Sequence, residues 1–112
     1  MNKVLVVDDD ATLAGIISEV FATANQSTIV ATTSDEALRI IRDDAEISTI
    51  LADYRLKGNR TGLDVLREAQ ATKAGLRCFL MSGDLQRITE SVSGIEVLAK
   101  PLRMSDLLAR VN

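Results

Sequence analysis

The sequence predicts a doubly wound α/β fold, in which five parallel strands alternate with five helices. Apolar runs rich in β-branched residues alternate along the chain with segments whose apolar residues recur at helical spacing. Several of the runs are continuously apolar, as expected for parallel strands that are covered on both faces. The chain has 112 residues, of which 46% are hydrophobic, so we expect one domain over residues 1–112 with an ordinary core. Cys78 is the only cysteine and cannot form an internal disulfide.

Five short runs predict the strands. They are Val4–Val7, Thr28–Ala31, Ile47–Ala52, Cys78–Met81 and Ile95–Leu98. Each β-α-β crossover in such a chain is right-handed, so neighbouring strands run parallel and helices cover both faces of the sheet. For five strands the common doubly wound arrangement is the flavodoxin-like order 2-1-3-4-5.

Stripes of apolar residues predict the helices. They are Leu13, Ile16, Ile17, Val20 and Phe21; Ala37, Leu38, Ile40 and Ile41; Leu63, Val65, Leu66 and Ala69; and Met104, Leu107, Leu108 and Val111. A thinner stripe of Leu85, Ile88 and Val92 predicts the remaining helix over Gly83–Ser93.

Helix boundary signals agree with these stripes. Ser34 precedes two acidic residues, which favours a helix start. Thr61 and Asp64 have the spacing of a capping box. Asn25 and Gly75 stand where the first and third helices should end.

Polar residues suited to phosphate chemistry follow four of the five predicted strands. They are Asp8, Asp9 and Asp10 after the first strand, Asp53 after the third, Ser82 after the fourth and Lys100 after the fifth. In the predicted order the first and third strands are neighbours, so their carboxylates should repel one another unless a cation joins them. Carboxylates, carbonyls and water are ligands of Mg²⁺, the usual ion where phosphate is also bound. A carboxylate nucleophile, a lysine and a serine hydroxyl would complete a site for phosphoryl transfer.

Each of these residues alone has an ordinary explanation. An acidic pair after a strand, or Asp53 at a strand end, can simply cap the next segment. Ser82 before Gly83 is a common turn, and Lys100 before Pro101 can be a solvated side chain ahead of a helix. The coincidence of all of them at one edge of a sheet favours the functional interpretation.

The residues around these positions resemble the receiver domain of response regulators in two-component phosphorelays, over essentially the whole chain. The resemblance rests on Val6-Val7-Asp8-Asp9-Asp10, Asp53 after Ile50-Leu51-Ala52, Gly62, Leu80-Met81-Ser82-Gly83 and Ala99-Lys100-Pro101. It implies a phosphoacceptor domain that assists its own phosphorylation and dephosphorylation, rather than an enzyme.

The resemblance also implies a role for each site residue. Asp53 would accept a phosphoryl group from a partner's phospho-histidine. Asp9 and Asp53 would ligate Mg²⁺ directly, Asp8 through water, and Arg55 through its main-chain carbonyl. Ser82 and Lys100 would bind the phosphoryl oxygens.

The chain departs from this family in three places. The family's proline after the phosphorylation-site loop is absent, and the segment Leu56–Gly62 is slightly long, which is similar to receivers of hybrid sensor kinases. The segment between Ser82 and Lys100 is a few residues short. Val97 stands where the family usually has tyrosine or phenylalanine, so the usual aromatic switch is missing.

Two other interpretations compete with the receiver. Asp8-Asp9-Asp10-Ala11-Thr12 fits the motif of haloacid-dehalogenase-like phosphatases, with Asp8 as nucleophile and Asp10 as general acid. That family needs further acidic residues after the lysine, where this chain has only Asp106, and it leaves Asp53 without a role. The other interpretation is a scaffold that uses the receiver fold without phosphorylation.

Charge and composition limit the partners. The net charge is −3 and lysine and arginine form no cluster, so we expect no direct nucleic-acid binding. The chain has no histidine, so a phospho-histidine must come from a partner. The N-terminal apolar run is too short for a signal peptide or for membrane insertion, which predicts a cytoplasmic location. We expect a histidine kinase or histidine phosphotransfer protein as partner, with a second receiver in a weak homodimer as a further option, and an output in another polypeptide or outside this sequence.

Overall fold

A five-stranded parallel sheet forms the centre of the molecule, with strands in the order β2-β1-β3-β4-β5. The computed structural model describes residues 2–83, 94–101 and 103–111. The elements along the chain are β1 (Lys3–Val7), α1 (Ala11–Thr23), β2 (Ser27–Ala31), α2 (Ser34–Asp43), β3 (Ile47–Asp53), α3 (Gly62–Thr72), β4 (Arg77–Ser82), β5 (Ile95–Ala99) and α4 (Met104–Val111). The predicted fold and strand order are confirmed. Four helices lie in the described parts of the chain, and the helix predicted over Gly83–Ser93 falls outside them apart from Gly83.

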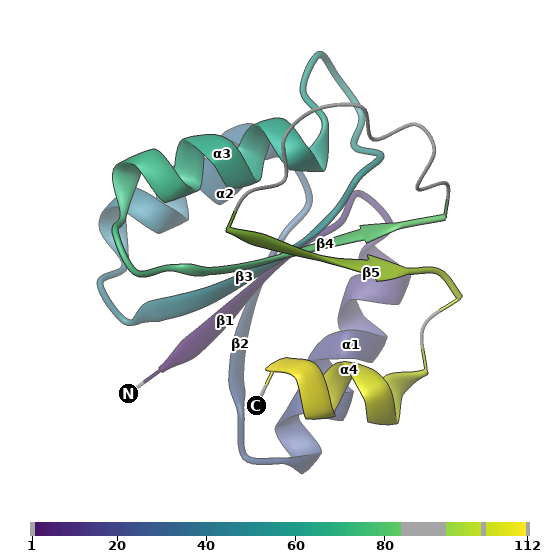
Figure 1. The fold of residues 1–112 in the computed structure, drawn as a ribbon. Coiled ribbons are helices and arrows are strands. Elements are labelled where there is room, and N and C mark those ends of the chain that lie inside the picture. Colours follow the sequence, from purple (N-terminus) through teal and green to yellow (C-terminus); the bar gives the residue numbers. More distant parts are fainter. Residues whose placement is uncertain (1, 84–93, 102, 112) are drawn as a thin grey trace.

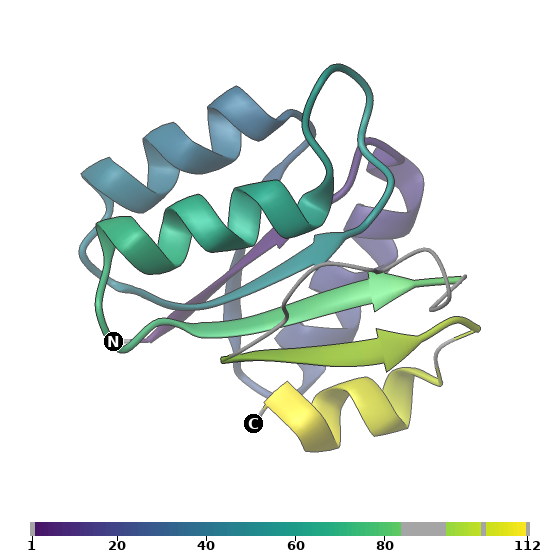
Figure 2. The same cartoon turned by 45° about the horizontal axis from the view of Figure 1, so that its top comes forward.

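The helices form two layers, one on each side of the sheet (Figure 1). α2 and α3 lie together on one face, and α1 and α4 lie together on the other, as the tilted view in Figure 2 also shows. Each layer buries its own apolar cluster, one that includes Leu5, Ile50 and Leu66 and one that includes Val6, Phe21 and Leu107. Covering on both faces explains why several of the strands are continuously apolar in sequence.

Most helix boundaries follow the sequence signals. Thr61 and Asp64 form the predicted capping box, each side chain accepting from the other's main-chain N–H. Asn25 adopts φ 59° just after α1, as a helix-ending asparagine can. The helix start predicted at Ser34 is confirmed, since α2 begins there, and the preceding Thr33 caps it, because its side chain accepts the N–H of Glu36.

The sequence also singled out Gly75, as a residue that should end the third helix, and Cys78, as a buried cysteine. Gly75, with φ 82°, lies in the turn before β4 rather than directly at the end of α3, which ends at Thr72. Cys78 is buried, and burial raises the pKa of its thiol to about 11. It is therefore an inert thiol in the core, as its apolar neighbours in sequence indicated.

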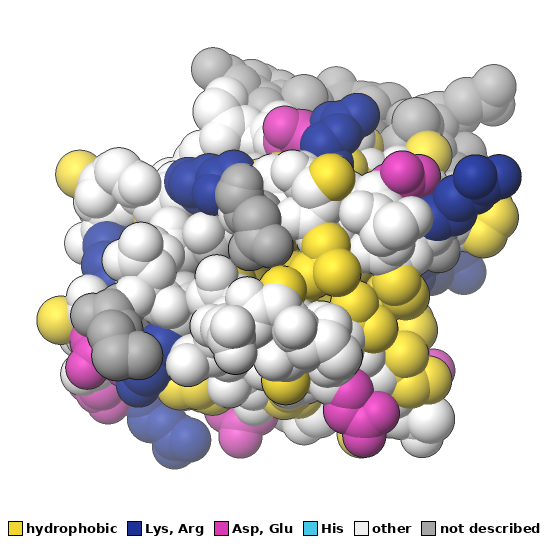
Figure 3. All heavy atoms as spheres, turned by 90° about the horizontal axis from the view of Figure 1, so that it is seen from below, with side chains coloured by type: hydrophobic (Ala, Val, Ile, Leu, Met, Phe, Trp, Pro, Cys, Tyr) yellow, Lys and Arg dark blue, Asp and Glu magenta, His cyan; other side chains and the backbone are white. Residues whose placement is uncertain are grey.

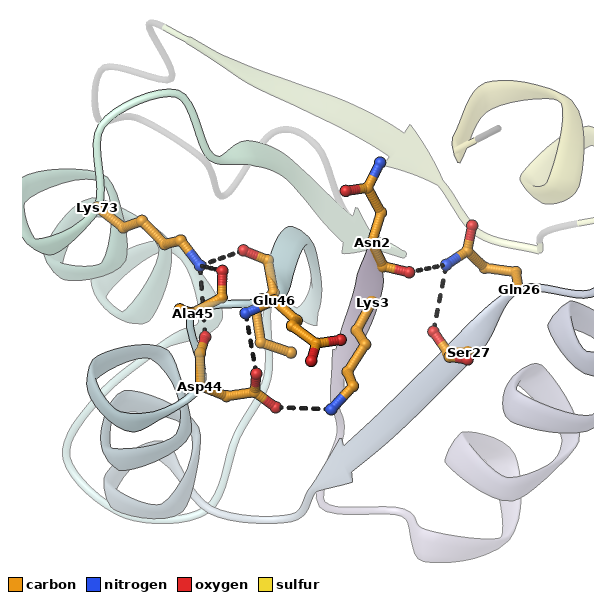
Figure 4. A network of polar contacts seen from close by, with 9 residues as sticks. Asn2, Lys3, Gln26, Ser27, Asp44, Ala45, Glu46 and Lys73 are labelled. Carbon is orange, nitrogen blue, oxygen red and sulfur yellow. Dashed lines mark hydrogen bonds and ion pairs between the residues drawn. The ribbon is translucent and has the colours of Figure 1, made fainter.

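A network of polar contacts lies at the end of the sheet where the strands begin (Figure 4). The ammonium of Lys73 donates to the carbonyl oxygens of Asp44 (3.4 Å), Ala45 (3.1 Å) and Ile47. Lys3 pairs with the Asp44 carboxylate at 3.1 Å. These contacts satisfy carbonyls of the α2–β3 connection and fix the chain where β3 begins.

Candidate functional site

Three carboxylates meet where β1 and β3 end. Asp8 and Asp9 follow β1 directly, and Asp53 is the last residue of β3. One carboxylate oxygen from each of the three lies within 4.8 Å of the others. This proximity arises because β1 and β3 are paired, with Val7 opposite Ala52. An acidic pocket that could hold a metal ion is therefore present, as the predicted strand order required.

Asp8 is the most deeply placed of the three, with 1% of its surface exposed. Its Oδ1 accepts the main-chain N–H of Asp10 at 2.9 Å, whereas Oδ2 is buried and has no hydrogen-bond partner among the described residues. Burial raises the pKa of the Asp8 carboxyl, and the nearby charges of Asp53 and Asp9 raise it further. The Asp10 N–H and the charge of Lys100 offset this in part. A buried oxygen without a partner beside two other carboxylates fits a hard cation such as Mg²⁺.

Lys100 supplies the positive charge on the other side of Asp53. Its Nζ donates to Asp53 Oδ1 at 2.8 Å. Its main-chain N–H donates to the carbonyl of Ser82 at 2.9 Å, which fixes the end of β5 against the end of β4. Ser82 is 4% exposed at the end of β4, the strand next to β3. Asp53 therefore lies between the two acidic residues of β1 and the lysine and serine of the outer strands.

The main chain after Asp53 is held closely against α3. Tyr54 donates its N–H to the carbonyl of Met81 at 2.8 Å, and its own carbonyl accepts the N–H of Gly62 at 2.8 Å. A Cβ on Gly62 would lie 2.0 Å from the carbonyl oxygen of Asp53, so only glycine fits without a backbone shift. The start of α3 thus determines where the Asp53 main chain can lie.

The loop of residues 54–61 makes a contact that the sequence did not predict. The main-chain N–H of Lys57 donates to Asp9 Oδ2 at 3.1 Å. Every residue except proline carries such a donor, so no residue type indicates it. Arg55, two residues past Asp53 in the same loop, has an exposed side chain, and its predicted role involves only its carbonyl.

An apolar hollow of about 440 Å³ lies beside the site on the α1 and α4 face. Figure 3 views this face, where hydrophobic side chains gather between more polar surroundings. The hollow is lined by Leu13, Ile17, Met81, Lys100, Pro101 and Met104. Ile16, which lies on α1 together with Leu13 and Ile17, is 47% exposed.

None of the helices in the described residues is both long and apolar enough to cross a bilayer.

The family model of the response regulator receiver domain matches residues 4–112, and the chain belongs to this family of two-component signalling proteins. Among curated proteins it is similar to the transcriptional regulatory protein CpxR of Klebsiella pneumoniae and of Escherichia coli K12. Both are 28% identical over 115 residues, which span 100% of this chain and 48% of the relative. The chain thus spans about half the length of the curated relatives it matches.

Solved structures show the same fold. A receiver domain protein from Clostridium thermocellum superposes with a TM-score of 0.89 at 27% identity, covering 100% of this chain and 92% of that one. A CheY-like receiver from Methanospirillum hungatei has a TM-score of 0.88 at 22% identity, covering 99% and 90%. The receiver of the hybrid histidine kinase CckA has a TM-score of 0.83 at 22% identity, covering 98% and 95%.

The phosphatase alternative finds no support in these comparisons, and one contact speaks against it. Asp10, its general acid, accepts the N–H of Leu13 at 3.1 Å and caps the N-terminus of α1. The side chain that this interpretation needs as a proton donor is therefore already engaged as a helix cap. Asp53, which that interpretation left without a role, forms an ion pair with Lys100 beside Asp8 and Asp9.

Proposed function

We propose that this chain relays a signal by accepting a phosphoryl group on Asp53 from the phospho-histidine of a histidine kinase or histidine phosphotransfer protein. The observation that carries the proposal is the position of Asp53. Its carboxylate lies within 4.8 Å of two other carboxylates and has a lysine ammonium 2.8 Å away. Phosphoryl transfer to a carboxylate requires a nucleophile that lies beside a site for a cation and beside a positive side chain.

The ligands of Mg²⁺ in this proposal are Asp9 and Asp53 directly, Asp8 through water, and the main-chain carbonyl of Arg55. The unpartnered Oδ2 of Asp8 and the crowding of the carboxylates support a divalent cation here. When bound, the ion supplies positive charge that neutralises the phosphoryl oxygens and brings them to the carboxylate.

In the reaction, an oxygen of Asp53 forms a bond to phosphorus while the bond from phosphorus to the imidazole nitrogen of the donor breaks. The electron pair of the broken bond stays on that nitrogen. Lys100 moves its ion pair from the Asp53 carboxylate toward the phosphoryl oxygens, and the Ser82 hydroxyl donates to one of them. The chain thereby assists its own modification without turning over a substrate.

The donor must bring its histidine to the edge of the sheet, because this chain has none. The apolar hollow beside Lys100, together with the exposed Ile16, offers a surface next to the site on which a partner could pack. We propose no direct contact with nucleic acid, since the net charge is −3.

Incubation with acetyl phosphate and Mg²⁺, followed by intact-mass measurement, tests the proposal. We expect wild type to gain the mass of one phosphoryl group, and Asp53→Asn or addition of chelator to prevent it, because the nucleophile or the cation is then missing. Phosphorylation that persists in Asp53→Asn but is lost in Asp8→Asn would instead support the phosphatase mechanism.

A further inference from the structure

We propose that the main-chain N–H of Lys57 is a positioning group for the metal site, which holds the Asp9 carboxylate in the orientation that binds Mg²⁺. The inference rests on the proposed function, in which Asp9 is a direct ligand. It adds a contact from the loop of residues 54–61, which would otherwise serve the ion only through the carbonyl of Arg55.

Each of the three carboxylates of the site accepts a hydrogen bond within the described part of the chain. The Asp10 N–H binds Asp8 Oδ1 at 2.9 Å, and the Lys100 ammonium binds Asp53 Oδ1 at 2.8 Å. The Lys57 N–H donates to Asp9 Oδ2 at 3.1 Å, from 48 residues away in sequence. A donor on one carboxylate oxygen leaves the other oxygen to face a cation.

Asp9 has particular need of such a donor. Unlike Asp8 it is only partly buried, so the surrounding packing restrains its side chain less. A carboxylate that can rotate must lose this freedom when it ligates an ion. Hydrogen bonds to the non-ligating atoms of a metal ligand remove that cost in advance, and their loss typically weakens metal binding by 10–100-fold, roughly.

The contact also joins the ion to the loop. Residues 57–60 are exposed, and Gly58 adopts φ 102° directly after Lys57. If the N–H helps Asp9 to bind the ion, the bound ion must in turn strengthen the hold of Asp9 on the N–H, because coupling between two binding events is reciprocal. Mg²⁺ should therefore slow hydrogen exchange at the Lys57 amide.

A pair of variants isolates the N–H from the side chain. Lys57→Ala and Lys57→Pro both remove the ammonium group, but only proline removes the main-chain donor. With Mg²⁺ alone as the ligand, titration calorimetry on the full chain should give Lys57→Pro an affinity about ten-fold below that of Lys57→Ala. In wild type, NMR should show slower exchange of the Lys57 amide at saturating Mg²⁺ than in chelator.

The outcomes separate this inference from the proposed function. If Lys57→Pro binds Mg²⁺ as tightly as Lys57→Ala or more tightly, the inference is overturned. The Lys57 N–H then makes no contribution to Mg²⁺ binding or competes with the ion for Asp9. If Lys57→Pro does not fold, unchanged exchange of the Lys57 amide in wild type overturns it instead. Asp9→Asn serves as the separate control, since unaltered Mg²⁺ binding by that variant would contradict the ligand set itself.

Discussion

A charge on Asp8 destabilises the folded chain, because this residue combines near-complete burial with an oxygen that has no hydrogen-bond partner among residues 2–83, 94–101 and 103–111. Two like charges, on Asp9 and Asp53, add repulsion. Binding of a cation at this pocket would recover the cost. The metal-free chain should therefore be less stable than its packing alone would allow.

We expect Asp8→Asn to raise the free energy of unfolding in chelator by about 1 kcal/mol, roughly the scale of one pKa unit. Asparagine keeps the oxygen that accepts the Asp10 N–H but removes the buried charge. Urea unfolding at neutral pH measures the change. Asp10→Asn is the matched control, because asparagine also caps helices well and Asp10 is exposed, so its effect should stay within about 0.5 kcal/mol.

The pH dependence of this gain has a definite sign. The pKa of Asp8 is raised in the folded state above its ordinary value of 3.8, so the folded chain binds the proton more tightly than the unfolded chain does. The advantage of Asp8→Asn should vanish below that ordinary value, grow as the pH rises through the raised pKa, and then stay constant. A less stable variant at neutral pH would show that the Asp8 charge makes a favourable contact that these distances do not reveal.

At the scale of elements, the junction between β3 and α3 decides where the Asp53 main chain lies. Gly62 allows the first turn of α3 to contact the carbonyl of Asp53, and the capping box of Thr61 and Asp64 starts the helix there. The end of β3, the loop that follows it and the capped start of α3 together fix the position of the Asp53 main chain.

Two glycine substitutions distinguish this close contact from ordinary helix propensity. Gly62→Ala should destabilise the fold by roughly 2 kcal/mol, because a Cβ 2.0 Å from the Asp53 carbonyl oxygen forces the backbone apart. Gly15→Ala, inside α1 and with no atom within 4 Å of the added Cβ, should stabilise it by about 0.5–1 kcal/mol. Urea unfolding curves of the two variants provide the comparison. Similar effects from both would mean that the backbone at the β3–α3 junction yields easily.

At the scale of the whole molecule, the proposed phosphorylation of Asp53 raises the question of how far from the site the conformation changes. Val97 lies on β5 opposite Leu80 and packs, partly buried, against the core. It is β-branched and restricted at χ1, so it cannot exchange a large ring between buried and exposed positions. A bound group shifts a conformational equilibrium only by the difference in its affinity for the two conformations. Because Val97, the residue that would couple the site to the rest of the molecule, is small, we expect a small shift.

Backbone NMR shifts with and without beryllofluoride, a phosphate mimic, should therefore change around Asp9, Asp53, Ser82 and Gly83 and fade before α4. α4 is also tied to the sheet, because Arg77 donates to the carbonyls of Arg110 (3.1 Å) and Val111 (2.7 Å). Large and uniform shifts along Met104–Val111 would contradict this expectation and show that a valine suffices for a complete switch.

The sequence by itself determined the fold class, the strand order and which residues gather at the strand ends. These follow from local signals, since apolar runs and stripes define each element, and the handedness of crossovers leaves few ways to arrange five strands. Once β1 and β3 are neighbours, Asp8, Asp9 and Asp53 must meet. The capping box of Thr61 and Asp64 could likewise be predicted from the sequence, because both residues lie within one helical turn.

Only the tertiary structure decided the features that depend on distance between remote segments. The burial of Asp8 Oδ2 and the hydrogen bond from the Lys57 N–H to Asp9 have no signature in residue types. Gly62 belongs to the family resemblance, but its residue type alone does not indicate that it contacts the Asp53 carbonyl. Main-chain donors and carbonyls are the same at nearly every position, so their partners depend on how loops close rather than on which residues they contain. The choice of Thr33 over Ser34 as the cap of α2 is a small instance of the same rule, since both residue types can cap and the path of the chain leaving β2 selects one.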